Sequence, residues 1–247
     1  METVEVFVAH DGRNFAKSAL YTTSVAISID SVLARVFPPA SSCSSQLQSC
    51  ADEAKLPSRL YLRCSVPREF YERDVESPAR RLFPELEKES EKDGGKADEK
   101  DDEKKRKTDR LRYFKEENTL LWVSTAGNVT PLHYDRCHGV LCQVVGHKRV
   151  LLVCPEETSN VYARSADTGM AHTSAADLHA AVDEGRPSPA HPSLARCEVL
   201  YVLLAPGEAL YIPPGWWHHV TTLSPSVSLT WAWDPLSSEP LPANMYR

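Results

Sequence analysis

The sequence of 247 residues has no apolar run near the ~20 residues that a membrane-spanning helix needs. It also lacks an excess of positive charge. The formal net charge is −6, so no overall basic field attracts nucleic acid or an anionic membrane. The first five residues show neither the basic nor the apolar stretch of a signal peptide. We therefore expect a soluble protein of the cytoplasm, the nucleus or both, with no membrane partner.

Paired cysteines are lacking as well. The seven cysteines are odd in number and scattered, and no two of them form a C-x-x-C pair. A disulfide framework and a paired zinc knuckle both need such pairs, so this pattern argues against either. We expect most of these cysteines to be small core residues in a reducing compartment.

One stretch of the chain departs from globular composition. Residues 85–110 are dominated by Glu, Lys and Asp and cannot bury enough apolar surface to offset the cost of ordering. We expect a disordered insert there, between N-terminal strands and a helix (residues 1–84) and a β-rich core (residues 111–247), with one domain overall. The basic run at 104–107 is either a nuclear localisation signal or a solvated charge run.

Short β-forming segments separated by Pro and Gly turns fill most of the remainder. The expected strands cover 4–8, 24–29, 119–124, 140–145, 149–153, 198–204, 209–212, 218–222 and 227–233, with another opening at 60–62. Gly146 and His147 have the pattern of a tight hairpin between two of them. Helices are expected only after a cap at Asp30 and Ser31, and at 175–182 within the polar excursion 159–196. The pattern predicts a mainly β double-stranded β-helix, the jelly roll of cupins, with a few peripheral helices.

A histidine and an aspartate two residues apart open one of these β-rich stretches, Val129-Thr130-Pro131-Leu132-His133-Tyr134-Asp135. Residues i and i+2 of a strand share a face, so His133 and Asp135 can offer a nitrogen and an oxygen to one point. A third ligand is available in the distant run Tyr211-Ile212-Pro213-Pro214-Gly215-Trp216-Trp217-His218-His219. Two histidines and one carboxylate with open positions are the ligand set of non-heme Fe(II) oxygenases. Alternation alone leaves open whether His218 or His219 completes it.

Lysine 148 begins the strand 148–153, where it shares a face with Val150 and Leu152. A lysine among inward-facing aliphatic side chains is costly unless an anion pairs with it. The alternative turns Lys148 outward and Arg149 inward. The other histidines, with no comparable spacing, are read as structural: His10, His147, His172, His179 and His191.

Two segments of the chain resemble the metal-binding segments of the JmjC (cupin-like) 2-oxoglutarate oxygenases. The first runs from Trp122 to Asp135, and the second is Gly207-Glu208-Ala209-Leu210-Tyr211-Ile212-Pro213-Pro214-Gly215-Trp216-Trp217-His218. The similarity extends from about Leu60 to Trp233. It is nearest to the small hydroxylase branch, which includes the asparaginyl hydroxylase of hypoxia-inducible factor and the tRNA wybutosine hydroxylase.

The resemblance implies an Fe(II) site held by His133, Asp135 and His218, which would act as the catalytic ligand set. It implies that Lys148 pairs with the distal carboxylate of the cosubstrate 2-oxoglutarate. Thr130 and Tyr61 match positions whose hydroxyls bind the same carboxylate. With O₂, such a site would hydroxylate a protein side chain or a tRNA base and release succinate and CO₂.

The match has departures. Gly139 stands where relatives often have asparagine, a loss for which His138 could compensate, and Trp231-Ala232-Trp233 replaces a more usual Asn-Phe-Trp. The chain starts late relative to these relatives and ends soon after Trp233, as expected for a compact member or an incomplete gene model. Lysine demethylation, and a catalytically inactive cupin-like interaction protein, are the alternative functions. The sequence leaves the prime substrate and the oligomeric state open.

Overall fold

A computed structural model of the chain describes residues 3–9, 22–38, 59–66, 68–72, 118–236 and 238–246. The expected disordered insert at 85–110, its basic run and the domain boundaries on either side lie outside these residues.

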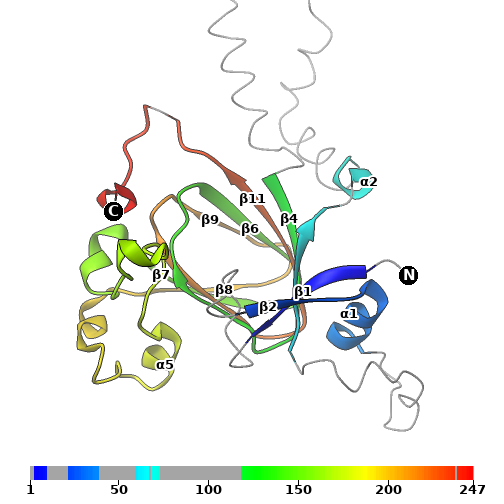
Figure 1. The fold of residues 1–247 in the computed structure, drawn as a ribbon, viewed down its shortest axis with the longest axis horizontal. Coiled ribbons are helices and arrows are strands. Elements are labelled where there is room, and N and C mark those ends of the chain that lie inside the picture. The colour runs from blue at the N-terminus through cyan, green and yellow to red at the C-terminus, as the bar shows by residue number, and fades with distance from the viewer. Residues whose placement is uncertain are drawn as a thin grey trace, which may run out of the picture.

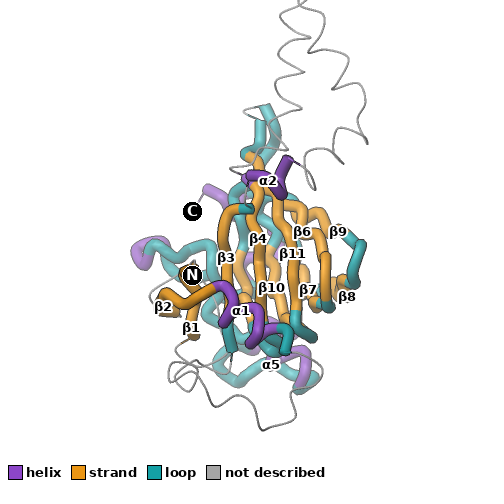
Figure 2. The backbone as a smooth tube through the Cα atoms, turned by 90° about the vertical axis from the view of Figure 1, so that its right-hand side faces the viewer, coloured by secondary structure: helices purple, strands orange, loops and turns teal. Residues whose placement is uncertain are grey.

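Two antiparallel sheets make up the fold (Figures 1 and 2). The larger sheet contains, in spatial order, β2 (Thr22–Ser28), β1 (Thr3–Ala9), β3 (Tyr61–Ser65), β4 (Thr119–Ser124), β11 (Ser226–Trp233), β6 (His138–Val145) and β9 (Ala209–Ile212). The smaller sheet contains β5 (Val129–His133), β10 (Trp217–Thr222), β7 (Lys148–Val153) and β8 (Leu200–Leu204). The predicted mainly β, cupin-like jelly roll is confirmed.

Apolar side chains from both sheets meet between them. Leu141 of β6 packs with Val150 and Leu152 of β7 and with Leu204 of β8. The opposite face of the smaller sheet is covered by helical turns, where Leu151 and Trp217 pack against Leu178 of the helix α5 (Leu178–Asp183). The smaller sheet therefore buries both faces, which explains the nearly continuous apolar run of β7.

Two sequence predictions about local structure are corrected. Residues 140–145 and 149–153 do form strands, but they are not a hairpin, because β6 belongs to the larger sheet and β7 to the smaller one. The chain crosses between the sheets at Gly146, which has φ +74° and would place a Cβ 2.1 Å from the carbonyl oxygen of Pro225. A glycine is required by this close approach.

The second correction concerns the helix α1 (Ile29–Val36). It begins earlier than expected, and its N-cap is Ser28, whose hydroxyl accepts a hydrogen bond from the backbone N–H of Ser31. Asp30 instead lies in the first turn, where a carboxylate interacts favourably with the helix dipole. Valines 32 and 36 bury this helix against the larger sheet.

The excursion 159–196 contains more helical turns than expected. The 3₁₀ turns η6 (Pro155–Ser159), η7 (Ala166–Thr168) and η8 (Pro192–Arg196) accompany α5, and Asp177 caps the latter. The short helix α2 (Arg68–Phe70) follows β3, and the 3₁₀ turn η9 (Ala243–Tyr246) ends the described chain.

In the ranges that the structure describes, no helix is long and apolar enough to span a membrane. The five cysteines that the structure describes are free thiols: Cys64, Cys137, Cys142, Cys154 and Cys197.

Candidate metal centre

Two histidines from neighbouring strands of the smaller sheet face each other. His133 is the last residue of β5, and His218 is its direct cross-strand partner in β10. Their ring centroids are 4.1 Å apart. The sheet register therefore joins two residues that are 85 positions apart in the sequence.

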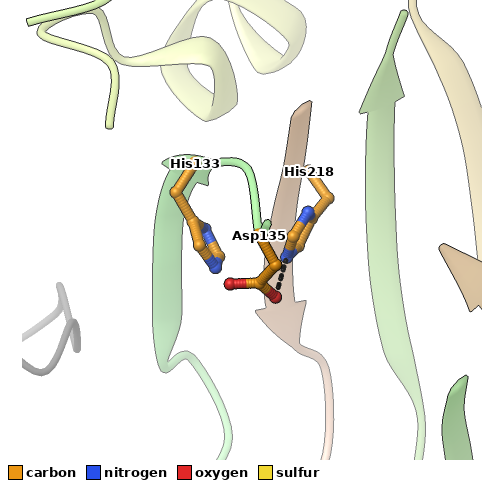
Figure 3. A group of neighbouring side chains, drawn as sticks. All are labelled: His133, Asp135 and His218. Carbon is orange, nitrogen blue, oxygen red and sulfur yellow. Dashed lines mark ion pairs between the residues drawn. The ribbon is translucent and has the colours of Figure 1, made fainter. Parts of the chain in front are cut away.

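Asp135 completes the group from just beyond the end of β5 (Figure 3). The backbone at this point is held on two sides. The N–H of Tyr134 donates to the carbonyl of His172, and the N–H of Gly215 donates to the carbonyl of Asp135, both at 2.9 Å. The carboxylate lies 3.7 Å from Nε2 of His218. All three potential ligand atoms lie within 4.8 Å of one another, and no second cluster of this kind occurs in the described residues.

Backbone carbonyls orient both imidazole rings. Nδ1 of His133 lies 2.7 Å from the carbonyl oxygen of Pro131, and Nδ1 of His218 lies 3.1 Å from that of Trp216. A proton on each Nδ1 leaves the Nε2 lone pair free to bind a metal ion. Figure 3 shows the three side chains pointing toward one another. This donor arrangement fits a divalent transition metal.

The protonation states of the group suit the same role. Burial, and then the neighbouring His218, lower the pKa of His133 to about 4, so its ring is neutral at physiological pH. Burial alone would raise the pKa of Asp135, but His218 and His133 outweigh it and hold that pKa below its usual value. A neutral imidazole and an ionised carboxylate are the forms that bind metals.

The group opens into a cavity of about 580 Å³ between the two sheets. Besides the three ligands, the lining side chains that matter for its chemistry are Tyr61, Arg63, Trp122, Thr130, Cys137, Gly139, Lys148, Met170, His172 and Trp231. Both sheets and the excursion 159–196 therefore contribute to one cavity wall. Asp135 is the only carboxylate among the described residues that line it.

Lys148 lines this cavity, and Val150 and Leu152 on the same face of the strand pack in the core between the sheets. Only 2% of the surface of Lys148 is exposed, and no carboxylate pairs with it in the described part of the chain. Burial lowers the pKa of Lys148 to about 7. The alternative orientation is excluded, because Arg149 faces the other side of the sheet and pairs with Asp183 at 2.8 Å.

Thr130 and Tyr61 reach the cavity from opposite sheets. Their hydroxyl oxygens are 3.5 Å apart, one on β5 and the other on β3. Burial raises the pKa of Tyr61 to about 12, so it remains a neutral donor. These hydroxyls and the Lys148 ammonium line the same cavity as the candidate metal ligands.

His138 has a role other than the one expected for it. It does not line the cavity, because its Nδ1 contacts the hydroxyl of Tyr211 at 2.7 Å and its Nε2 contacts Glu239 at 2.9 Å. The place of the family asparagine stays empty: a Cβ on Gly139 would meet nothing closer than the carbonyl oxygen of Trp231 at 4.0 Å.

Sequence reasoning missed two cavity residues. His172, read as structural, lies on the excursion, and burial lowers its pKa. No local pattern could have placed a residue of this long excursion at the cavity. Arg63 follows Tyr61 by two positions on the same strand, so the strand period was a signal that could have identified it.

The fold and this group of side chains define a cupin-like protein with a candidate metal centre. A model of the cupin-like domain matches residues 39–239, and the chain belongs to this cupin-like JmjC family. Members of the family are typically Fe(II)- and 2-oxoglutarate-dependent oxygenases, so the expected oxygenase class is supported at this coarse level.

Three relatives illustrate the match. The chain is 39% identical to Jumonji C domain-containing protein 5 of Drosophila melanogaster over 46% of its own length and 27% of the relative's. It is 38% identical to Lysine-specific demethylase JMJ30 of Arabidopsis thaliana, over 45% of its own length and 25% of the relative's. It is 27% identical to tRNA wybutosine-synthesizing protein 5 of Danio rerio, over 49% of its own length and 34% of the relative's. The matched region thus spans only about a quarter to a third of each relative.

Proposed function

We propose that the chain is an Fe(II)- and 2-oxoglutarate-dependent dioxygenase that hydroxylates its prime substrate. The observation that carries this proposal is the presence, in one cavity, of a two-histidine, one-carboxylate group and a buried lysine without a carboxylate partner among the described residues. The first suits a divalent metal with open positions, and the second requires an anion.

His133, Asp135 and His218 would hold the iron. When bound, iron and 2-oxoglutarate supply oxidative decarboxylation, in which O₂ places one oxygen in succinate and one in the substrate, with release of CO₂. The Lys148 ammonium would neutralise the distal carboxylate of the cosubstrate, and the hydroxyls of Tyr61 and Thr130 would donate hydrogen bonds to it. The buried wall around them keeps bulk water from this carboxylate.

The charges of the cavity favour hydroxylation over lysine demethylation, although relatives named for lysine demethylation and for tRNA wybutosine synthesis both match the chain. A methylated lysine is a cation. Among the described lining residues, the basic groups besides histidines are Arg63 and, when protonated, Lys148, against the single carboxylate of Asp135, which the metal would use. A cationic side chain would enter this cavity without an acidic partner, which costs free energy. A protein side chain or a tRNA base that carries no positive charge fits better.

A catalytically inactive interaction protein is the other alternative. Such a protein has no need of a buried lysine without a carboxylate partner among the described residues, since this lysine destabilises a fold that leaves it unused. The retained set supports an active centre.

Succinate formation from 2-oxoglutarate tests the proposal. The purified wild-type chain is expected to release succinate only when Fe(II) and O₂ are supplied. His133→Ala and Asp135→Ala are expected to abolish this release, and His147→Ala, which removes an exposed histidine outside the cavity, serves as the matched control. Unchanged turnover in either ligand variant would contradict the proposal.

A further inference from the structure

Arg63 places a second cation in the cavity wall. It lies on β3 opposite Trp122 of β4, and its guanidinium carbon is 5.2 Å from the centre of the Trp122 ring. Trp122 is itself held in place, because its indole N–H donates to the Thr230 hydroxyl at 2.8 Å. A guanidinium over a fixed indole is oriented before any ligand arrives.

The guanidinium of Arg63 has no acidic partner in the described part of the chain. Its Nε is buried and makes no hydrogen bond. Arg149 also has a buried Nε without a hydrogen bond, but it has an acidic partner in Asp183 at 2.8 Å, as Arg68 has in Glu72 at 2.9 Å. A guanidinium in a cavity wall with no acidic partner leaves donors for an anionic ligand, which would supply a charge-assisted hydrogen bond.

The cosubstrate does not account for this cation. 2-Oxoglutarate has two carboxylates, and in the proposed function one binds the metal while Lys148 pairs with the other. Arg63 is then left over. It shares the cavity with the metal ligands. An anion on Arg63 would therefore lie in the same space as the carbon to be oxidised.

We propose that Arg63 binds a carboxylate of the prime substrate, and that this substrate is a protein segment with an aspartate or glutamate at or next to the hydroxylated residue. The inference rests on the proposed function and narrows its substrate class. A single oriented guanidinium matches a single carboxylate bidentately. Nucleic acid usually engages several phosphates at once, and, histidines aside, the described cavity wall offers only Arg63 and, when protonated, Lys148 as cations in a chain of net charge −6.

Affinity selection from a random library tests the inference without a known substrate. The whole chain, loaded with Mn(II) and 2-oxoglutarate so that no turnover occurs, is incubated with capped nine-residue peptides randomised at every position. The retained peptides are sequenced by mass spectrometry. Wild type is expected to enrich Asp or Glu at one position by about tenfold, the scale of a charge-assisted hydrogen bond.

Variants assign the preference to Arg63. Arg63→Gln is expected to lose the acidic enrichment, Arg63→Lys to retain part of it, and Arg186→Gln, an exposed arginine outside the cavity, to keep it. Thermal unfolding of each variant identifies any that fail to fold. If Arg63→Gln does not fold, the reduced acidic enrichment expected of Arg63→Lys becomes the test. No acidic enrichment by the wild type, or the same enrichment in Arg63→Gln, would overturn the inference.

Two further arms separate the rivals. A random pool of nine-nucleotide single-stranded RNA, retained in an Arg63-dependent manner in place of peptides, would assign the site to phosphate and overturn the acidic-peptide class. Loss of 2-oxoglutarate binding in Arg63→Gln would assign Arg63 to the cosubstrate. Acidic enrichment that depends on Arg63 in a wild type that releases no succinate would sustain the carboxylate site while the proposed function fails.

Discussion

Basic and histidine side chains have different surroundings on the two faces of the smaller sheet. On the outward face, Arg149 pairs with Asp183 at 2.8 Å and His219 stacks on His179 with ring centroids 5.6 Å apart. On the inward face, their chain neighbours Lys148 and His218 line the cavity. Each pair is adjacent in the sequence, and the strand period sends its members to opposite sides.

The difference between these faces indicates which face binds ligands. Outward cations and imidazoles contact other side chains of the protein, as in a structural layer. The inward ones converge on a space large enough for ligands, and Lys148 is buried there without a carboxylate partner among the described residues. Polar groups that a fold leaves uncompensated identify a site for another molecule.

Replacing the two adjacent histidines should separate the faces most strongly. His218→Ala removes a proposed metal ligand, so we expect at least ~1,000-fold less succinate formation, beyond the 10–100-fold that changes around a ligand cost. His219→Ala should lower the melting temperature yet retain metal binding, because it removes a buried side chain on the face turned away from the cavity. Metal content by atomic absorption and thermal unfolding measure both. Equal metal loss in the two variants would break the distinction between the faces.

The adjacent cations of β7 give the second test. Lys148→Met is expected to weaken 2-oxoglutarate binding about 100-fold through loss of a charge-assisted hydrogen bond. The same change should stabilise the protein by about 1–2 kcal/mol, because it removes a buried amine without a partner. Arg149→Met should instead cost about 1 kcal/mol of stability through the lost contact with Asp183, and leave cosubstrate binding intact. Calorimetry measures the affinity for 2-oxoglutarate, and denaturant unfolding measures the opposite stability changes expected of the two variants. A destabilised Lys148→Met would contradict the inference that Lys148 is buried without a partner.

The affinity for 2-oxoglutarate should depend on pH. Lys148 has a pKa of about 7 in the free protein, lowered by burial, and a bound carboxylate would raise it. Below pH 7 the lysine is already protonated, so affinity is flat; above pH 7 binding must take up a proton, and the dissociation constant should rise about tenfold per pH unit. Lys148→Arg, whose guanidinium stays protonated, should give a flat profile. A wild-type affinity that is constant from pH 7 to 8.5 would show that Lys148 does not meet the carboxylate.

The smallest effects are expected from the hydroxyls beside this lysine. Tyr61→Phe and Thr130→Val each remove one neutral hydrogen bond, so each should weaken 2-oxoglutarate binding roughly five-fold, about 1 kcal/mol. Combined, the two losses should be less than additive, since the hydroxyls are 3.5 Å apart and interact. A titration of the single and double variants measures this, and a double variant with wild-type affinity would remove both residues from the site.

Much of this organisation could be predicted from the sequence, because alternation and turn residues act locally. The strand 119–124 appears with the expected bounds, and the face shared by Lys148, Val150 and Leu152 is the one that lines the core and cavity. Strand pairing is not local. The supposed hairpin around Gly146 failed because a tight turn can also pass the chain from one sheet to the other.

The candidate site shows the same division. His133 and Asp135 could be proposed from spacing, whereas the choice of His218 over His219 came only from resemblance, since the bend before them resets the register. His172 could not be found, because tertiary packing brings its excursion to the cavity. Arg63 could have been found from the strand period, but an arginine is usually solvated, so the period alone did not favour a cavity position.

The central claim is that the inward face holds a metal and an anion together. Calorimetric titration of the wild type with 2-oxoglutarate, under anaerobic conditions and with or without Fe(II), tests it most directly. We predict one equivalent of 2-oxoglutarate bound only when the metal is present, and none in Lys148→Met at the same concentrations. Binding that does not require the metal, or that survives unchanged in Lys148→Met, would contradict the account.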